Sequence, residues 1–300
     1  MKLTVIAATV ACVLWAGTAL AQDDAANAAK RQQLLQSLHY QTGEIALAKA
    51  DAHLHLKPGF RYLDQSDARK VLEDLWGNPP DEDVLGLLVP ENAGLDSDHS
   101  WAVVLTYSDS DGHVSDEDAA KIDYTQMLKD MQQGTQEENE ERKKSGYSTV
   151  QLVGWAQPPR YDAETKKLHW AKELAFSDAD GHTLNYDIRV LGREGYLSME
   201  AVADMADQAL VNDGMQQVLP LAEFDSGHRY ADFNPKTDKL AAYGLAALVA
   251  GGIAAKTGLL AKIGVMLLAA KKLVAVAFVA VAAFVKKIFG GRGRGGGTVS

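Results

Sequence analysis

The sequence predicts an α+β fold, an antiparallel sheet with flanking helices, followed by C-terminal helices suited to a membrane. Stretches of alternating apolar and polar residues recur between 44 and 202. Four of them lie within 150–202 and are joined by short connections, which favours antiparallel neighbours. Stretches with apolar residues at helical spacing interrupt and follow them. The last sixty residues are different, because they hold eight basic residues and no acidic one.

The organisation along the chain follows from these patterns. Residues 1–21 read as a secretory signal peptide with cleavage between Ala21 and Gln22. A weaker alternative is a lipoprotein signal in which Cys12 is acylated. We expect an N-terminal leader at 22–43, an extracytoplasmic α+β domain at 44–238, membrane-anchoring helices at 239–289, and a basic glycine-rich tail at 290–300. Within the leader, 22–30 is a loose segment or a frayed helix, and 31–40 could form a short helix.

The elements of the domain are predicted in order. Alternation over 44–56 predicts one strand, which Pro58 and Gly59 end. Asp64 or Ser66 caps a helix to Trp76. The remaining predictions are strands at 84–89 and 101–107, a helix from a Ser115 cap to Lys144, strands at 150–155, 168–176, 183–191 and 196–202, a helix at 204–219, and a short strand at 221–224.

Charge and cysteine content exclude several classes of function. Residues 22–239 hold 21 basic and 40 acidic residues, a net charge of −19, so this surface repels phosphate backbones and we expect no nucleic-acid partner. Cys12 is the only cysteine, so a processed chain has no disulfide, thiol nucleophile or cysteine-bound metal. The motifs of serine hydrolases, zinc proteases, P-loop NTPases and dinucleotide-binding enzymes are absent. We expect no cofactor.

The C-terminal segment predicts attachment to a membrane. Its longest apolar run, 273–285, gives about 20 Å of helix. The side chains at its two ends, Lys271, Lys272, Lys286 and Lys287, can snorkel to the membrane surface. A helix extended to Phe289 is therefore long enough to span a membrane. A second apolar run covers 240–255. Two topologies remain, one pass with a cytoplasmic basic tail or a two-pass hairpin; a buried helical hairpin in a soluble protein is the less favoured alternative.

Two loops echo each other and are candidate calcium sites. The segments 107–114 and 176–183 both read aromatic-Ser-Asp-x-Asp-Gly-His, with carboxylates at Asp109, Asp111, Asp178 and Asp180. The first ligand position holds an aromatic residue in each, and the distal glutamate of an EF-hand is missing. Asp-Gly is also common hairpin chemistry, so we favour turns.

Three further groups are weaker candidates. His53 and His55, with Asp51, share one face of a strand and could contact a metal, although a solvated strand face is the simpler interpretation. Glu223, Asp225, His228 and Asp232 could supply an acid–base pair, but a hydrogen-bonded latch at the domain edge is favoured. The turn containing Trp155, Pro158, Pro159, Arg160 and Tyr161 could bind a peptide or glycan, or could close the end of a strand.

Several contiguous stretches resemble a known family. They are VLEDLWGNPP, WAVVLTYSD, VSDEDAAKIDY, LVGWAQPPRYD, LNYDIRVLGREGYL, HRYADFNP and KLAAYGLAALVAG, which lie in most of the mature chain. On these the chain resembles the DUF2167 family of uncharacterised bacterial membrane-anchored proteins. The resemblance implies export and anchoring but no activity and no site residues. The order of elements is also similar to the PsbP/Mog1-type α/β/α sandwich, which says little about function.

Together these features predict a periplasm-facing protein of the bacterial inner membrane. We expect a non-enzymatic interaction or envelope-maintenance module, with membrane lipid as a partner and another envelope protein as a further candidate. The alternative is a metal-dependent or hydrolytic envelope enzyme that uses His53 and His55, or the group of Glu223, His228 and Asp232.

Overall fold

A seven-stranded antiparallel sheet forms the centre of the molecule. The structure is a computed structural model and describes residues 27–97 and 99–250. In spatial order the strands are β3 (Phe60–Asp64), β4 (Val84–Pro90), β5 (Val103–Ser108), β10 (Tyr196–Asp204), β9 (His182–Leu191), β8 (Lys167–Phe176) and β7 (Val150–Asp162). Every neighbouring pair is antiparallel. The four consecutive strands β7 to β10 form a meander, as their short connections predict.

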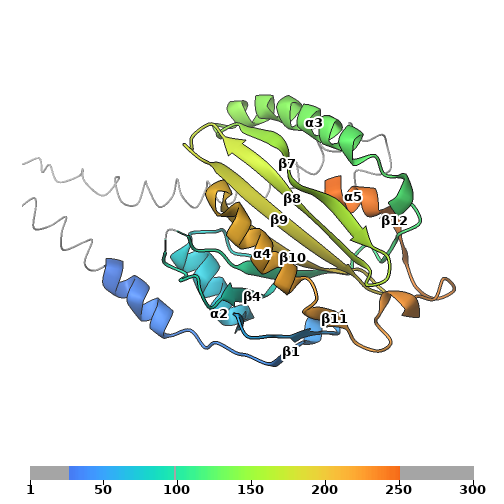
Figure 1. Cartoon of the computed structure of the whole chain (residues 1–300), viewed down its shortest axis with the longest axis horizontal. Coiled ribbons are helices and arrows are strands. Elements are labelled where there is room, and N and C mark those ends of the chain that lie inside the picture. The colour runs from blue at the N-terminus through green and yellow to red at the C-terminus, as the bar shows by residue number, and fades with distance from the viewer. Residues whose placement is uncertain (1–26, 98, 251–300) are drawn as a thin grey trace, which may run out of the picture.

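The inner face of this sheet is covered by one helix and a small second sheet. Helix α4 (Gln208–Val218) lies in front of the strands in Figure 1, near the three-stranded sheet of β1 (Glu44–Leu47), β2 (Ala52–His55) and β11 (Ala222–Phe224). The alternating residues Leu184, Tyr186, Ile188 and Val190 of β9 point into this layer and are buried. Gly214 of α4 permits the close approach of Trp101, whose Cη2 would lie 2.4 Å from a Cβ there.

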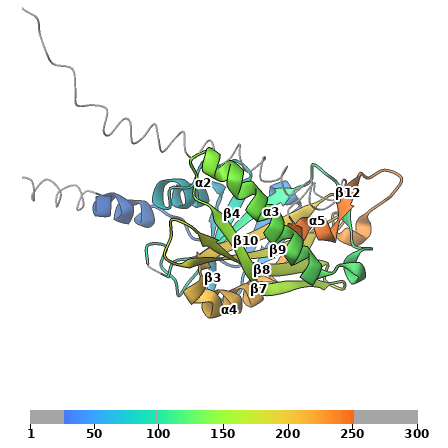
Figure 2. The ribbon, with the colours of Figure 1, turned by 90° about the horizontal axis from the view of Figure 1, so that it is seen from above.

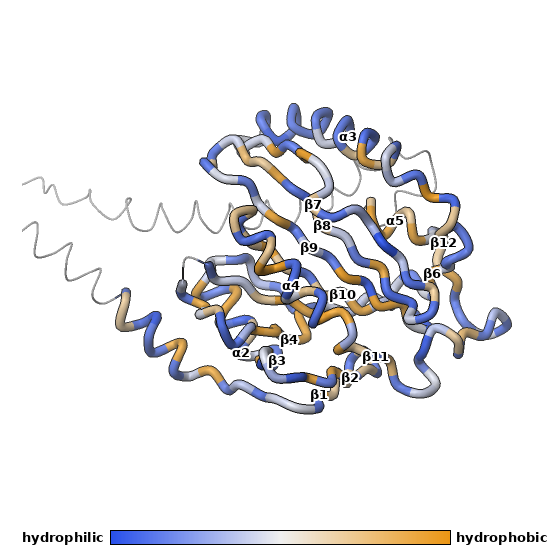
Figure 3. The backbone as a smooth tube through the Cα atoms, viewed as in Figure 1, coloured by the Kyte–Doolittle hydropathy of each residue, from blue (hydrophilic) through white to orange (hydrophobic). Residues whose placement is uncertain are grey.

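The outer face is covered in two separate halves. Helix α2 (Gln65–Arg69) continues as the π-helix η2 (Lys70–Leu75) and packs over β3 and β4. Helix α3 (Tyr124–Lys144) packs over β7 through Met127 and Met131, and Figure 3 shows it hydrophilic along most of its length. Figure 2 shows α4 on one side of the sheet and α2, α3 and α5 on the other. The domain therefore has three layers.

The last described elements return to the outer face. Strand β12 (Leu240–Gly244) pairs in parallel with β6 (His113–Ser115), and α5 (Leu245–Ala250) follows it directly. Ala241, Tyr243, Leu245 and Leu248 are buried with residues of α3 and β8. The folded domain thus extends beyond 238, where we expected it to end, and reaches at least Ala250. The expected membrane helices beyond Ala250 and the tail at 290–300 lie outside the described residues, as does the signal peptide. No helix within 27–97 or 99–250 combines the length and apolarity needed for a membrane span.

The other elements agree with prediction except at three places. The turn expected at 155–161 is part of strand β7, which continues to Asp162. Residues 44–56 are not one strand but β1 and β2, because Asp51 adopts a left-handed conformation (φ 47°) after the short helix η1 (Ala48–Ala50). Ser115 belongs to β6 and caps no helix; after the short helix η3 (Ala119–Lys121), Asp123 caps α3 by accepting from the amides of Thr125 and Gln126. Predicted capping of the helix after Asp64 is confirmed, since Asp64 accepts from the amide of Asp67. The last short helices are η4 (Met205–Asp207) and η5 (Tyr230–Asp232).

Side-chain amides and a guanidinium close the exposed edge of the sheet at β7. Asn139 of α3 both donates to the carbonyl of Val150 (2.7 Å) and accepts from its amide (2.9 Å). Gln132 donates to the carbonyls of Leu152 and Val153, and Arg142 to that of Ser148. Because edge strands with free backbone groups invite pairing with another chain, this capping disfavours strand addition at β7.

Candidate functional site

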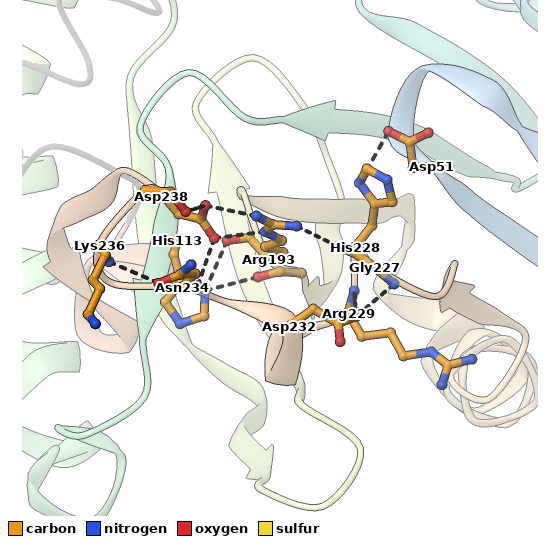
Figure 4. A network of polar contacts seen from close by, with 12 residues as sticks. Asp51, His113, Arg193, Gly227, His228, Arg229, Asp232, Asn234, Lys236 and Asp238 are labelled. Atoms are coloured by element: carbon orange, nitrogen blue, oxygen red, sulfur yellow. Dashed lines mark hydrogen bonds and ion pairs between the residues drawn. The ribbon is translucent and has the colours of Figure 1, made fainter.

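The polar contacts of the molecule are concentrated where the chain leaves the domain. We call this region the junction: residues 225–250 together with residues 108–118 before α3 and the turn 192–195 between β9 and β10. These three segments are far apart in sequence, yet five of the seven stretches that resemble the family contribute to them. Figure 4 shows part of the network.

An ion pair ties the exit segment to the sheet. The guanidinium of Arg193 donates from Nε (2.7 Å) and Nη2 (2.9 Å) to the two oxygens of Asp238, and from Nη1 to the carbonyl of Gly227 (3.0 Å). Asp238 also accepts from the amide of Asn234 (2.8 Å) and the hydroxyl of Thr237 (2.7 Å). These donors, Arg193 first, hold the pKa of Asp238 far below its usual value. Because two parallel hydrogen bonds join the guanidinium and the carboxylate, they fix the relative orientation of the two side chains as well as their distance.

A buried histidine fills the space beneath this pair. The ring of His113 stacks on Phe233 at 3.9 Å and lies 4.3 Å from the ring of Tyr230. Its Nδ1 is 3.2 Å from the carbonyl oxygen of Gly192 and 3.1 Å from that of Arg193, so Nδ1 carries a proton and donates. Burial lowers the pKa of His113, which is therefore neutral at pH 7.

Asp116 joins four segments through one carboxylate. Its Oδ2 accepts from the hydroxyl of Tyr161 (2.6 Å) and the ammonium of Lys166 (2.7 Å), and its Oδ1 from the hydroxyl of Tyr230 (2.9 Å). Burial acts to raise the pKa of Asp116, but these hydrogen bonds outweigh it and the pKa is lowered. Burial and the same contact raise the pKa of Tyr161. The carboxylate is thus held ionised.

Two more aspartates hold the final strand and helix. Asp118 accepts from the amides of Leu245 (3.1 Å) and Ala246 (3.3 Å), which caps α5, and Tyr243 donates to Asp111 (2.8 Å). The approach depends on glycine, because a Cβ at Gly244 would lie 2.7 Å from Asp118 Oδ2. At Gly112 (φ +90°) a Cβ would lie 2.3 Å from the carbonyl oxygen of Lys239.

The polar side chains of the junction hold its three segments together. The carboxylates of Asp116, Asp118 and Asp238 all accept hydrogen bonds from residues of the protein itself, and His113 donates to two backbone carbonyls. These groups are engaged in holding residues 225–250 against the sheet. Of the two interpretations of residues 223–232, a hydrogen-bonded latch fits this arrangement better than an acid–base pair.

The two histidine groups predicted separately are brought together beside the junction. The Nδ1 atom of His53 in β2 contacts the carboxylate of Asp225, its Nε2 lies 3.8 Å from Glu44, and its ring is stacked with that of His55 at 6.3 Å. Glu223 is the register partner of His53. Nearby, His228 Nδ1 lies 3.5 Å from Asp51 (Figure 4). Asp232 points back into its own turn and accepts from the amides of Gly227 and Arg229. These contacts tie β1 and β2 to the exit segment.

The metal hypotheses receive no geometric support. Among residues 27–97 and 99–250, no three or more His, Cys, Asp and Glu side chains are placed to hold a metal ion. The two similar loops lie in different connections, and Asp111 instead accepts from Tyr243. Asp109 closes its turn by accepting from the amide of Gly112 through its carbonyl, and Asp178 and Asp180 lie in the β8–β9 turn. The preferred interpretation as turns fits this placement.

The expected aromatic binding surface is not formed. Trp155 packs against the outer cluster and donates from Nε1 to the carbonyl of Tyr124 (3.2 Å), while Tyr161 is bound to Asp116. Arg160 is exposed and pairs in register with His169, which lies on the other face. Alternation along β7 therefore separates Arg160 from the two aromatic side chains.

Sequence reasoning missed Arg193, His113, Asp116, Asp118 and Asp238. Their partners on other segments are 34 to 128 residues away, so no local pattern could pair them. For three of them a signal was present, because Asp116 and Asp118 lie in the family-like stretch VSDEDAAKIDY and Arg193 lies in LNYDIRVLGREGYL. His113 and Asp238 lie just outside these stretches.

Several solved structures match the chain at low similarity. Cyanobacterial PsbP (CyanoP) from Synechocystis sp. PCC 6803 shares 12% identity, with 63% of this chain and 93% of that chain covered and a TM-score of 0.34. The Ran-binding protein Mog1p of Saccharomyces cerevisiae shares 11% identity over 62% and 96%, with a TM-score of 0.34. LpqN, involved in cell envelope biogenesis of Mycobacterium tuberculosis, shares 12% identity over 63% and 92%, with a TM-score of 0.30. We draw no functional argument from similarities this low.

The sequence comparisons are more decisive. Curated proteins provide no match to the chain. Residues 39–282, most of the chain, match the family described as "Protein of unknown function (DUF2167)". The chain is a member of the DUF2167 family.

Proposed function

We propose that this protein is a non-enzymatic, membrane-anchored module of the bacterial envelope whose folded domain is joined to its anchor without a flexible linker. The observation that carries the proposal is the junction, in which contacts continue from Asp225 to α5. Helix α5, with the sequence LAALVA, has no polar side chain. The next fifty residues hold all eight basic residues of the tail and no acidic one.

A junction of this kind fixes the orientation of the domain on its anchor. A linker would let the domain tumble away from the membrane, whereas a helix capped by Asp118 and packed on the core fixes the direction of the chain as far as Ala250. The net charge of −19 on residues 22–239 opposes adsorption on anionic lipid, so a built-in attachment is consistent with work close to the membrane.

The junction also favours one of the two topologies. A second pass would need the apolar run 240–255, but its first eleven residues form β12 and α5. Their insertion would break the pairing with β6 and the contacts of Tyr243 and Asp118. We therefore favour a single pass within 271–289, with the basic C-terminus in the cytoplasm.

The test is extraction of membranes with alkaline carbonate, using the full chain with a reporter after Ser300. We expect the protein to remain in the membrane and the reporter to resist external protease in spheroplasts. A cleaved reporter would indicate a hairpin, and release into the supernatant would refute anchoring.

A second measurement addresses the role as an interaction module. Mild crosslinking in intact cells should capture another envelope component, and the yield should fall when Asp116→Asn loosens the domain on its anchor. Asp178→Asn, in the β8–β9 turn, is the matched control. If no envelope component copurifies from wild-type cells, the interaction role is wrong.

A further inference from the structure

A groove of about 640 Å³ lies on the outer face of the sheet, between η2 and strands β5 and β10. Its floor is formed by Val104, Thr106, Glu200 and Val202. Its wall is formed by Leu72, Trp76 and residues 78–80. Val202 is 58% exposed, more than any other large apolar side chain among the described residues.

The sheet itself creates this exposed floor. Alternation places Leu197, Met199 and Ala201 of β10 in the inner core, so Ser198, Glu200 and Val202 face outwards. The described helices on this face lie over β3 and β4 (α2 and η2), over β7 (α3) and over β8 (α5). The strip between them joins the apolar side chains of Val104 and Val202, which water solvates poorly, to a polar network in which Arg189 pairs with Asp187 and Glu200.

The strip between the groove and α5 is also unusual. Asp187 and Ser198 are only 8% and 5% exposed. Asn185 Oδ1 and Trp170 Nε1 are buried and have no hydrogen-bond partner among the described residues. Buried polar atoms normally have partners, so a further segment with polar groups is expected here.

The chain itself supplies a segment of suitable position and charge. Helix α5 packs with Leu168 and Trp170 of β8, on the same face as the groove. Strand β10 lies two strand spacings from β8 and β5 lies three, which corresponds to distances of about 10–15 Å. Twenty-two residues follow Ala250 before the apolar run at 273, enough for about 33 Å even at helical rise.

The charges are complementary. Residues 251–272 contain four lysines and no acidic residue, with the apolar stretches GLLA and IGVMLLAA between them. The residues that line the groove include three acids, Glu73, Asp81 and Glu200, and one base, Arg69. Arg69 pairs with Glu73, and Arg189 beside the groove pairs with Glu200. A segment that carries lysines and apolar side chains therefore matches a partly apolar groove whose lining has more acidic than basic groups.

We propose that residues 251–272 of this chain occupy the groove and cover the outer face of β5, β9 and β10. The domain would then be clasped by its own tail before the chain reaches the membrane. The proposal does not require membrane insertion, so failure of the carbonate test would leave it standing, and its own failure would leave anchoring intact.

Disulfide trapping tests this directly, because the processed chain has no cysteine of its own. Val202→Cys is combined, in the full chain in native membranes, with a single cysteine at Leu259, Leu260, Ile263 or Met266. A disulfide forms readily only when the Cα atoms are within about 7 Å. We expect at least one pair to give an intramolecular disulfide at tenfold or higher yield than the same tail cysteine with Leu210→Cys. Leu210 is 38% exposed and lies on α4, across the sheet.

Two further readouts exclude accidental trapping. Lys256→Glu with Lys262→Glu should lower the yield several-fold, and Val202→Cys alone should react with a water-soluble maleimide at least tenfold more slowly than Leu210→Cys. Disulfides between chains would show that a second copy fills the groove. Rapid labelling of the Val202→Cys variant would show an open groove, and slow labelling without any trapped pair would show that lipid or another protein occupies the groove. Each of these three results overturns the proposal.

Discussion

Replacement of Asp116 by asparagine tests how strongly the junction is held. Asp116→Asn keeps the size of the side chain but removes the charge that Lys166, Tyr161 and Tyr230 all engage. The amide retains one acceptor oxygen, so at least one of these donors loses its partner. Lys166, 29% exposed, loses its carboxylate.

The expected loss follows from these contacts. Hydrogen bonds to charged groups contribute about 1.5–3 kcal/mol each, but the three share one acceptor group and are not additive, so we expect a total loss of about 2–4 kcal/mol. For a domain of this size that corresponds to about 5–15 °C in melting temperature.

The assay is urea unfolding of the full chain in detergent, followed by tryptophan fluorescence, since Trp155 lies on the same strand as Tyr161. Asp178→Asn is the control and should change the free energy of unfolding by less than about 0.5 kcal/mol. A double-mutant cycle with Tyr230→Phe should show coupling above about 0.5 kcal/mol. If Asp116→Asn changes the free energy of unfolding as little as Asp178→Asn does, the carboxylate of Asp116 does not hold the junction together.

Three further predictions concern separate features. Gly244→Ala forces a Cβ to within 2.7 Å of a carboxylate oxygen and should lower unfolding free energy by about 1–3 kcal/mol, while Gly154→Ala, with nothing within 4 Å, should not; equal effects would contradict the close-approach argument. Burial lowers the pKa of His113 and His169, so on acidification these histidines bind protons at a higher pH in the unfolded chain than in the folded one. Stability should therefore fall as the pH drops below about 6.5, by up to about 1.4 kcal/mol per pH unit for each histidine. His169→Gln should flatten this slope, and an unchanged slope would show that His169 does not titrate on unfolding. Asn139→Ala exposes the β7 edge and should lower stability by about 1–2 kcal/mol and increase aggregation measured by light scattering; no change in either would show that the edge needs no capping.

Local patterns predicted much of the fold because they report local burial. The alternation of Leu184, Tyr186, Ile188 and Val190 identified β9, and the spacing of Met127 and Met131 identified α3. Local patterns failed where contacts with a segment distant in sequence determine the local structure. Ser115 resembles a helix cap, but it pairs in β6 with Gly244, nearly 130 residues further on. The left-handed backbone conformation of Asp51, which separates β1 from β2, does not change the alternation of apolar and polar residues and so cannot be recognised from it.

The candidate site could be predicted only in outline. The sequence pointed to a hydrogen-bonded latch in 223–232, but many contacts of the junction are made by Arg193, Asp116 and Asp118, whose partners lie on other elements. The apolar run beginning at Leu240 suggested membrane insertion, whereas its first residues pack in the domain core. Apolar composition alone cannot distinguish a protein core from lipid.

Hydrogen exchange of residues 240–250 in the full-length, membrane-bound protein tests the central claim most directly. If the domain continues without a linker into its anchor, the amides of Leu245 and Ala246, bound by Asp118, should exchange at least about 10³-fold more slowly than in a free peptide. Asp116→Asn should reduce that protection, which burial in lipid would not explain. Exchange at the free-peptide rate through 240–250 would mean that a flexible linker begins at Lys239, and the rigid junction would be wrong.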